Sequence, residues 1–171
     1  MSAKVAAARR QRLTGAMAGS GIDYLLVYGN AWQIDYLRYA TDFGILEGEA
    51  LALVSRDGEV RLFVDSELEA ERAKHETKDI DVVYAAEMLK AVESRLESLQ
   101  QFRVGIAPKR LMPQRIAART GDLKLGDATA LMDHLLMVKL DCEIEAIRTA
   151  AHMADEGYAV FRDAGDDSGG A

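Results

Sequence analysis

Few side chains in this sequence have the types and spacing that catalysis or metal binding requires. The three histidines, His75, His134 and His152, are scattered along the chain. His152 and Glu156 are four residues apart, which places them on one face of a predicted helix. Such a pair could supply two ligands of a metal site, but a solvated polar helix face is the stronger interpretation. We therefore predict no metal site in this chain.

Two further motifs give no reaction. The single cysteine, Cys142, lies between Asp141 and Glu143, and these carboxylates disfavour the thiolate form that a nucleophile needs. A lone cysteine cannot form an internal disulfide, which is typical of a reducing cytoplasm. The tripeptide 42–44, Asp-Phe-Gly, also occurs in kinases, but no Gly-rich loop or catalytic-loop motif accompanies it here. We interpret it as chance.

The best candidate for a binding surface lies in the aromatic stretch 21–43. Its first part, residues 24–28, is a continuous apolar run between two glycines, which is typical of a strand buried on both faces at the centre of an α/β sheet. Aromatic residues just past the end of such a strand can line a ligand or partner surface, and packing at one end of the core is the alternative. The candidate residues are Trp32, Arg38, Tyr39 and Phe43.

Composition excludes several classes of protein. The chain has 171 residues and a net charge of −7, which disfavours a nucleic-acid partner because phosphate binding needs clustered Lys and Arg. No apolar run approaches the roughly 20 residues that cross a bilayer. The charged N-terminal segment lacks the apolar core of a signal peptide. We expect a soluble, acidic, cytoplasmic α/β protein that binds neither nucleic acid nor membrane.

Apolar periodicity and turn residues predict alternating helices and strands. An Asp-Gly turn at Asp57 joins two apolar runs, and this pattern predicts an antiparallel hairpin. Helices that alternate with strands indicate a mixed β-sheet with helices on both faces. The predicted helices are 2–18 with Ser2 as N-cap, 66–73, 88–99, 113–119 and 128–136, and the predicted strands are 24–28, 50–54, 60–64, 81–84 (an edge strand), 103–107 and 123–125.

The last predicted helix, 141–164, differs from the others. Its apolar residues follow a spacing of 3, 4, 3, 4, 3, which is typical of a helix that packs on another helix. Asp141 is the predicted N-cap, Gly165 the predicted end, and residues 165–171 a disordered tail. The apolar stripe, which we predict to be an interface, consists of Ile144, Ile147, Ala151, Ala154, Tyr158 and Phe161.

Six segments, taken in order, form a wider pattern: 13–17, 21–27, 36–43, 51–58, 104–106 and 135–151. In the last of them, Lys139 is followed by Glu143-Ile144 and then by Ile147-Arg148. The pattern resembles the N-terminal domain of the creatinase/prolidase family, where a Lys, then Glu-Ile, then Ile-Arg-x-Ala introduce the catalytic domain. The resemblance covers residues from about 10 to 163.

The resemblance implies a fold and a role. The fold is α/β, with a mixed sheet flanked by helices and a ribonuclease H-like motif in residues 1–138, and a long junction helix in 139–164. Members of the family join this domain to a catalytic domain in which two Asp, one His and two Glu bind two metal ions and hydrolyse Xaa-Pro peptides or the amidine of creatine. Those ligands lie beyond the junction helix, so we expect a truncated chain with no active site and no metal cofactor of its own, which contributes to dimerisation and pocket shaping.

In relatives, loops at the position of the aromatic stretch reach toward an active site, often that of the partner subunit, which makes Trp32, Arg38, Tyr39 and Phe43 substrate-proximal candidates. Leu136 stands where the junction usually has Arg, Leu140 where it often has Ser, and Asp42 where many peptidases have Gly. These differences concern the peptidase branch rather than the fold. Two alternatives remain open: a free-standing binding or dimerisation module of the same fold, and an unrelated small enzyme that uses the aromatic pocket.

Overall fold

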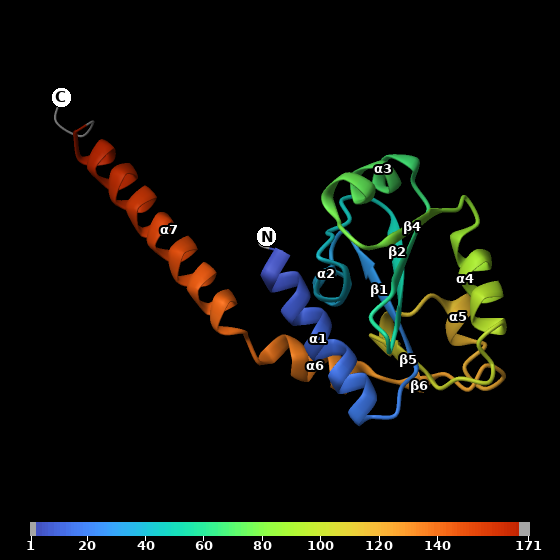
Figure 1. Ribbon diagram of the computed structural model, residues 1–171. Coiled ribbons are helices and arrows are strands. Elements are labelled where there is room, and N and C mark those ends of the chain that lie inside the picture. The colour runs from blue at the N-terminus through green and yellow to red at the C-terminus, as the bar shows by residue number, and fades with distance from the viewer. Residues whose placement is uncertain (1–2, 168–171) are drawn as a thin grey trace. The chain divides into compact units, whose positions relative to one another are not determined.

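A six-stranded sheet forms the centre of the first part of the chain (Figure 1). The computed structural model describes residues 3–167, which divide into two units at the boundary between Met137 and Val138. The strands run in the order β4-β3-β2-β1-β5-β6, so β1 is internal, as its unbroken apolar run predicts. The strands are β1 (Tyr24–Asn30), β2 (Glu49–Ser55), β3 (Val60–Val64), β4 (Asp81–Tyr84), β5 (Val104–Ala107) and β6 (Gly126–Asp127).

The sheet is mixed, which confirms the fold class predicted from the sequence. Strand β2 pairs antiparallel with both β1 and β3, whereas β3 with β4, β1 with β5, and β5 with β6 pair in parallel. All strands except β2 therefore point the same way, and their carboxyl ends meet at one edge of the sheet. Connections that follow β1 and precede β2 lie at this edge, since Asn30 pairs with Glu49.

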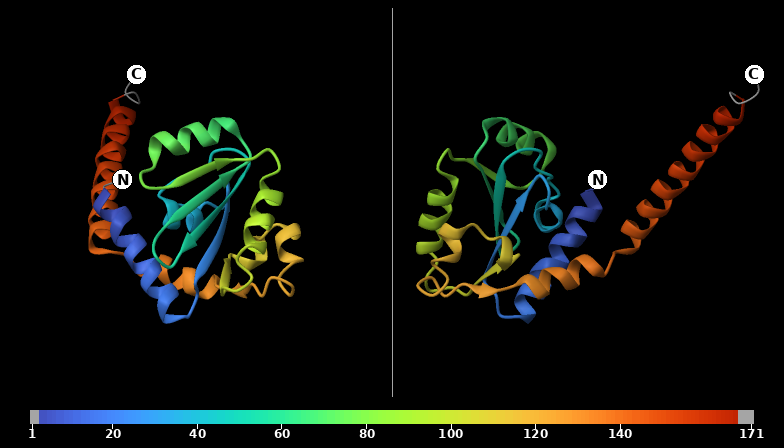
Figure 2. Two further views of the ribbon diagram at one scale, coloured as in Figure 1. Left: turned by 45° about the vertical axis from the view of Figure 1, so that its right-hand side comes forward. Right: turned by 180° about the vertical axis from the view of Figure 1, so that it is seen from behind.

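Helices cover both faces of the sheet, but unequally (Figure 2). Side chains alternate along β2, so that Ala50, Ala52 and Val54 belong to one core cluster while Leu51 and Leu53 belong to the other. The first cluster is completed by α1 (Ala3–Gly19), α2 (Asp35–Thr41), α3 (Glu67–Glu76) and α6 (Thr129–Met137). The second is completed by α4 (Met88–Glu97), the 3-10 turn η1 (Lys109–Leu111) and α5 (Gln114–Ala117).

The hairpin between β2 and β3 forms as its Asp-Gly turn predicts. Gly58 has a φ of 90°, a left-handed conformation that glycine adopts without steric cost. Its N–H donates to the Ser55 carbonyl at 3.0 Å, and the Ser55 N–H donates to the Glu59 carbonyl at 2.9 Å. The turn therefore closes the ladder and fixes the register in which Leu53 faces Arg61.

Several predicted boundaries are corrected. Residues 123–125 are not a strand: Leu123 and Leu125 are buried, but Lys124 has a φ of 52°, which breaks an extended chain, and the edge strand β6 follows at Gly126–Asp127. Helix α3 continues to Glu76. Helix α5 ends at Ala117, with Pro113 as its N-cap. The predicted N-cap Ser2 lies outside the described residues.

The second unit contains one long helix, α7 (Asp141–Asp167). The Leu140 N–H donates to Glu143 Oε2 at 2.7 Å, so Asp141 is the first helical residue rather than the N-cap. The helix passes through Gly165 and ends at Asp167, two residues beyond the predicted end, because glycine permits a turn without imposing one. Residues 168–171 of the predicted tail lie outside the described residues. A single helix has no core of its own, so only contacts outside this helix can cover its apolar stripe. Within residues 3–167, no helix combines the length and the apolar character needed to span a bilayer.

Candidate functional site

The turn that follows β1 presents the only tryptophan of the chain to solvent. The side-chain oxygen of Asn30 accepts hydrogen bonds from the Trp32 N–H at 3.0 Å and from the Gln33 N–H at 2.9 Å. This is the Asx-turn geometry that an asparagine after a strand favours, because its short side chain can replace a backbone acceptor. Trp32 is 93% exposed on this ordered turn.

A partly buried chain of polar side chains connects the turn to the neighbouring strand. Asn30 donates through Nδ2 to the Tyr28 hydroxyl at 3.1 Å, and this hydroxyl donates to Glu49 Oε1 at 3.0 Å. Burial is the main cause that raises the pKa of Tyr28; the Asn30 bond opposes the increase and Glu49 adds to it. Tyr28 therefore stays protonated and keeps its role as a donor. The turn that contains Trp32 is thus held by side chains from both β1 and β2.

Helix α2 follows this turn and packs its inner face on the sheet. Tyr39 is buried there, and the Arg9 guanidinium lies 5.5 Å from the centroid of its ring. The helix ends at Thr41, and its C-cap, Asp42, has a φ of 60° and donates its N–H to the Arg38 carbonyl at 2.8 Å. Burial raises the pKa of Asp42, while the positive charges of Arg9 and Arg38 oppose this increase.

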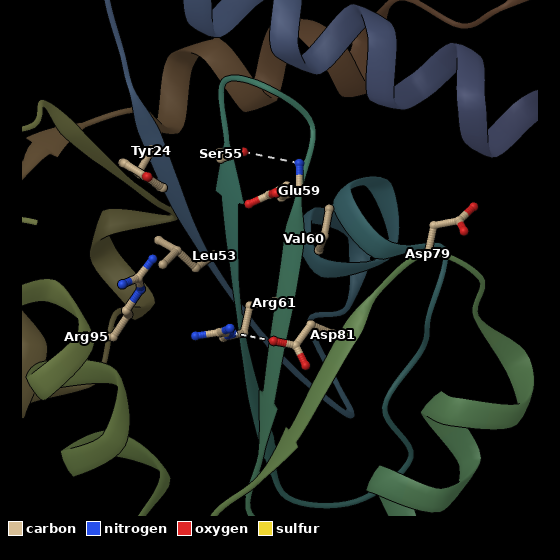
Figure 3. Close-up of a pocket in the computed structure, with 9 residues that line it drawn as sticks. All are labelled: Tyr24, Leu53, Ser55, Glu59, Val60, Arg61, Asp79, Asp81 and Arg95. Atoms are coloured by element: carbon tan, nitrogen blue, oxygen red, sulfur yellow. Dashed lines mark hydrogen bonds and ion pairs between the residues drawn. The ribbon is translucent and has the colours of Figure 1, made fainter. Parts of the chain in front are cut away.

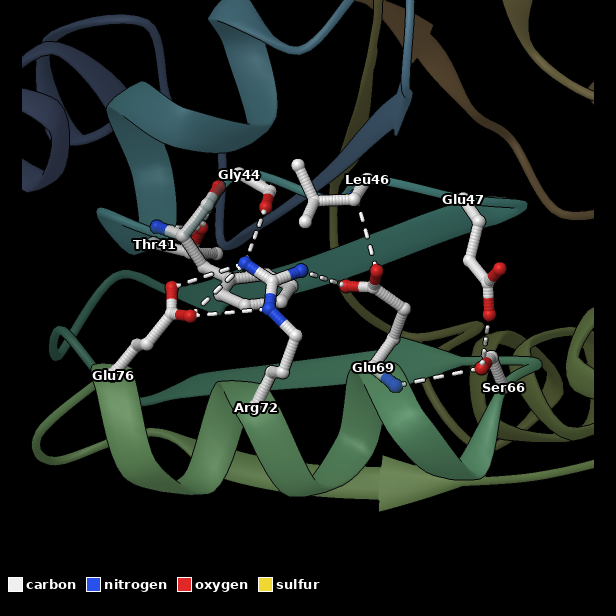
Figure 4. A network of polar contacts seen from close by, with 9 residues as sticks. Thr41, Gly44, Leu46, Glu47, Ser66, Glu69, Arg72 and Glu76 are labelled. Atoms are coloured by element: carbon white, nitrogen blue, oxygen red, sulfur yellow. Dashed lines mark hydrogen bonds and ion pairs between the residues drawn. The ribbon is translucent and has the colours of Figure 1, made fainter.

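The loop from α2 to β2, residues 42–48, is held by a charged network centred on Arg72 of α3 (Figure 4). Arg72 pairs with Glu69 Oε2 at 2.7 Å, donates to the Gly44 carbonyl at 3.4 Å and lies 5.2 Å from the centroid of the Phe43 ring. Glu69 is 1% exposed, and its other oxygen accepts the Leu46 N–H at 3.1 Å. The network fixes a loop whose Leu46 side chain is 70% exposed.

The turn 30–33 and the loop 42–48 lie at the same edge of the sheet, because β1 ends and β2 begins there. We call Trp32 and Leu46, with the backbone that presents them, the carboxyl-edge surface. Exposed apolar side chains on a backbone ordered by hydrogen-bonded polar groups are suited to bind a partner, since little ordering entropy remains to be lost.

The structure separates the four residues predicted to be substrate-proximal. Tyr39 and Phe43 are buried in the first core cluster, whereas Trp32 and Arg38 are exposed. Sequence reasoning missed Glu69 and Arg72, which hold the loop. A signal was present that we did not use: Glu69 lies four residues before Ala73 on the predicted helix, and a carboxylate on an alanine-lined helix face requires a cation nearby.

No group of three His, Cys, Asp or Glu side chains within residues 3–167 is arranged to hold a metal ion. His152 Nε2 lies 3.4 Å from Glu156 Oε1 on α7, and both side chains are exposed. The described residues therefore do not fit the two-metal centre that the sequence resemblance implies for the catalytic domain.

Comparison with protein families gives one match. The model of the creatinase/prolidase N-terminal domain family matches residues 9–138, which cover most of the chain and every strand. Among curated proteins no sequence match is found.

Several solved structures share the fold. The Xaa-Pro dipeptidase from Bacillus anthracis is 22% identical, with a TM-score of 0.68 over 90% of this chain and 42% of its own. The prolidase from Pyrococcus horikoshii OT3 is 20% identical, with a TM-score of 0.61 over 89% of this chain and 41% of its own. The N-terminal domain of the cytoplasmic peptidase PepQ from Mycobacterium tuberculosis H37Rv is 20% identical, with a TM-score of 0.60 over 75% of this chain and 98% of its own. This chain thus spans about two fifths of the prolidase and dipeptidase chains, but nearly all of the PepQ domain structure.

Proposed function

The chain belongs to the creatinase/prolidase N-terminal domain family, and we propose that it is the non-catalytic N-terminal domain of a metallohydrolase of that family. The parent enzyme would be an Xaa-Pro aminopeptidase, an Xaa-Pro dipeptidase or a related amidinohydrolase. The observation that carries this proposal is the family match over residues 9–138, in a chain that aligns with about two fifths of a prolidase. A cytoplasmic location is part of the proposal, supported by the single cysteine.

The catalytic domain would supply the metal centre. Two bound metal ions would activate a water nucleophile and stabilise the charge that develops on the scissile group. Because the described residues do not fit such a centre, we assign no catalytic step to this chain. Its proposed contribution is to dimerisation and to the shape of the substrate pocket.

The carboxyl-edge surface supports the dimerisation part of the proposal. A tryptophan side chain buries about 150–250 Å² at an interface, which corresponds to roughly 4–6 kcal/mol at 25 cal/mol per Å² before the costs of association. Trp32 is almost fully exposed and its turn is ordered by Asn30, so most of this area is available to a second copy of the chain. Tryptophan is one of the residues that are enriched in interface hot spots.

Sedimentation equilibrium over a range of protein concentrations tests this role. We expect a concentration-dependent dimer, and we expect Trp32→Ala to raise its dissociation constant by about 30-fold, as a hot-spot loss of about 2 kcal/mol would. Leu68→Ala, which truncates another exposed apolar side chain on α3, is the matched control and should leave the dissociation constant unchanged. A chain that stays monomeric, or that responds equally to both substitutions, would contradict the role of Trp32.

The alternative is a free-standing dimerisation module of the same fold. One observation favours it: the α7 stripe keeps its 3-4 spacing over the described helix, and its residues Ile147, Tyr158 and Phe161 are exposed, so two such helices could pair without a catalytic domain. The mass and sequence of the native gene product separate the two readings. The main proposal predicts a polypeptide that continues past α7 and contributes two Asp, one His and two Glu to a metal centre.

A further inference from the structure

A pocket of about 330 Å³ lies on the sheet face that fewer helices cover, at the hairpin end of β2 and β3 (Figure 3). Helix α4 packs on this face through Met88, Val92 and Leu96. Strands β3 and β4 extend past this contact, and their outward side chains there are charged rather than apolar. The volume lies at the lower end of the range for small-molecule sites, about 300–1,000 Å³.

One ion pair in the pocket is already satisfied. The sheet register places Leu53 opposite Arg61 and Arg61 opposite Asp81, so the three side chains form a row across β2, β3 and β4. Arg61 Nε donates to Asp81 Oδ2 at 2.6 Å. These two charges neutralise each other, and they leave the pocket with no net charge from this row.

Arg95 provides a cation with spare donors. It extends from the last turn of α4 toward Leu53, and its Nη1 donates to the Ser98 hydroxyl at 3.2 Å (Figure 3). Its Nε–H is enclosed, and within residues 3–167 no protein atom accepts a hydrogen bond from it. The guanidinium has four other N–H donors, on Nη1 and Nη2, and Ser98 uses only one of them. A carboxylate is the acceptor whose planar geometry matches these donors best.

Glu59 provides the complementary anion. It follows the hairpin turn and lines the same pocket, where its backbone N–H donates to the Ser55 hydroxyl at 3.1 Å. In Figure 3 its carboxylate is directed from β3 toward β2, and none of the ion pairs found among residues 3–167 involves it. Asp79, the remaining carboxylate of the lining, lies beyond β3 and is directed away from Arg95 in the same view.

The wall between these two charges is apolar and aromatic. Leu53 is buried beneath the pocket, and the Tyr24 ring borders it, held edge-on against Phe102 at a centroid distance of 5.3 Å. The pocket therefore combines one available cation, one available anion and an apolar surface. A dianion such as a phosphate would gain from Arg95 but would be repelled by Glu59, whose charge is not paired.

We propose that this pocket binds a small zwitterion, an α-amino acid or a dipeptide with an apolar side chain. Its carboxylate would accept hydrogen bonds from Arg95, its ammonium group would donate to Glu59, and its side chain would pack on Leu53 and the Tyr24 ring. The site is distinct from the carboxyl-edge surface, because the pocket lies where β2 ends and β3 begins, whereas β1 ends and β2 begins at the opposite edge. The inference does not depend on the proposed function.

Titration of the chain by two-dimensional NMR tests the proposal with unmodified protein. L-Leucine and L-leucyl-L-leucine should shift the amide signals of residues 53, 59–61 and 95. N-Acetyl-leucine, which lacks the ammonium group, and leucine amide, which lacks the carboxylate, should each bind at least about tenfold more weakly, because each loses a charge-assisted hydrogen bond. Inorganic phosphate should not compete.

Variants then assign the two charges. Arg95→Gln and Glu59→Gln should each weaken leucine binding by at least about tenfold. Lys90→Gln removes a charge from the same helix, where Lys90 pairs with Glu87 outside this pocket, and should have no effect. An equal affinity for N-acetyl-leucine would make this a carboxylate site only, and tighter phosphate binding would make it an anion site. Either result, or the absence of shifts with every zwitterion, would overturn the proposal.

Discussion

Replacement of Arg72 by methionine should destabilise the protein far more than the same change at a surface arginine. Arg72→Met keeps most of the side-chain volume but removes the charge that pairs with Glu69 at 2.7 Å. Removal of one partner of a buried pair costs about 3–5 kcal/mol, because the remaining charge stays buried without compensation. Glu69 is 1% exposed but keeps the Leu46 N–H as a donor, and Arg72 itself is 23% exposed, so we expect the lower end, about 3 kcal/mol.

Urea denaturation of three variants tests this reasoning. Arg61→Met is the matched control, since Arg61 pairs with Asp81 at 2.6 Å but the side chains are 44% and 55% exposed; it should cost less than about 1 kcal/mol. The double variant Glu69→Met and Arg72→Met removes both charges and should recover most of the stability lost by Arg72→Met alone. Equal losses for Arg72→Met and Arg61→Met, or no recovery in the double variant, would refute the claim that a buried charge pair holds the loop 42–48.

Three further predictions concern other parts of the fold. Gly58→Val should lower the free energy of unfolding by about 1–3 kcal/mol through backbone strain at its φ of 90°. A steric clash does not contribute, because a Cβ at this position meets nothing closer than Arg10 Cδ at 3.7 Å. Gly58→Asn should cost less, and an unchanged urea midpoint for the valine variant would contradict the turn geometry. Burial, and then the hydrogen bond to Asp133, raise the pKa of Tyr36 to about 12. The stability that this shift provides is complete below about pH 10 and is lost as the pH rises toward 12. The urea midpoint of the wild type should therefore exceed that of Tyr36→Phe by less at about pH 12 than at about pH 10, and a constant difference would contradict this. In α7, hydrogen exchange at the amides of Tyr158 and Phe161 should be fast in dilute protein and slow at high concentration, because two chains that associate bury the α7 stripe. Strong protection of these amides in a proven monomer would contradict this.

Much of the fold was predictable because local rules and tertiary packing agree. The apolar run at the start of the aromatic stretch became the internal strand β1, and the Asp-Gly turn set the β2–β3 hairpin. Residues 123–125 show where the local rule fails. Leu123 and Leu125 alternate with a polar residue as in a strand, but they belong to a turn in which Lys124 has a positive φ, and their side chains are buried. Alternation reports burial on one side, and a turn can satisfy it as well as a strand.

The candidate site was harder to predict, because residue type does not tell whether an aromatic side chain faces the core or solvent. Tyr39 and Phe43 were grouped with Trp32 as surface candidates, yet only Trp32 and Arg38 reach solvent. The zwitterion pocket was beyond sequence reasoning altogether: Glu59, Arg61 and Arg95 come together only through the hairpin register and the packing of α4 on the sheet. Long-range pairing of this kind leaves no periodic signal in one sequence.

The central claim, that this chain is the non-catalytic domain of a metallohydrolase, is tested most directly by hydrolysis of an Xaa-Pro dipeptide. The purified chain, supplied with Mn²⁺, Co²⁺ or Zn²⁺, is assayed for released proline against a blank that contains the metal alone. We predict no release above the blank at any chain concentration, because no group of carboxylates and imidazoles in residues 3–167 is arranged to hold a metal ion. Turnover that increases in proportion to the chain concentration would contradict the claim.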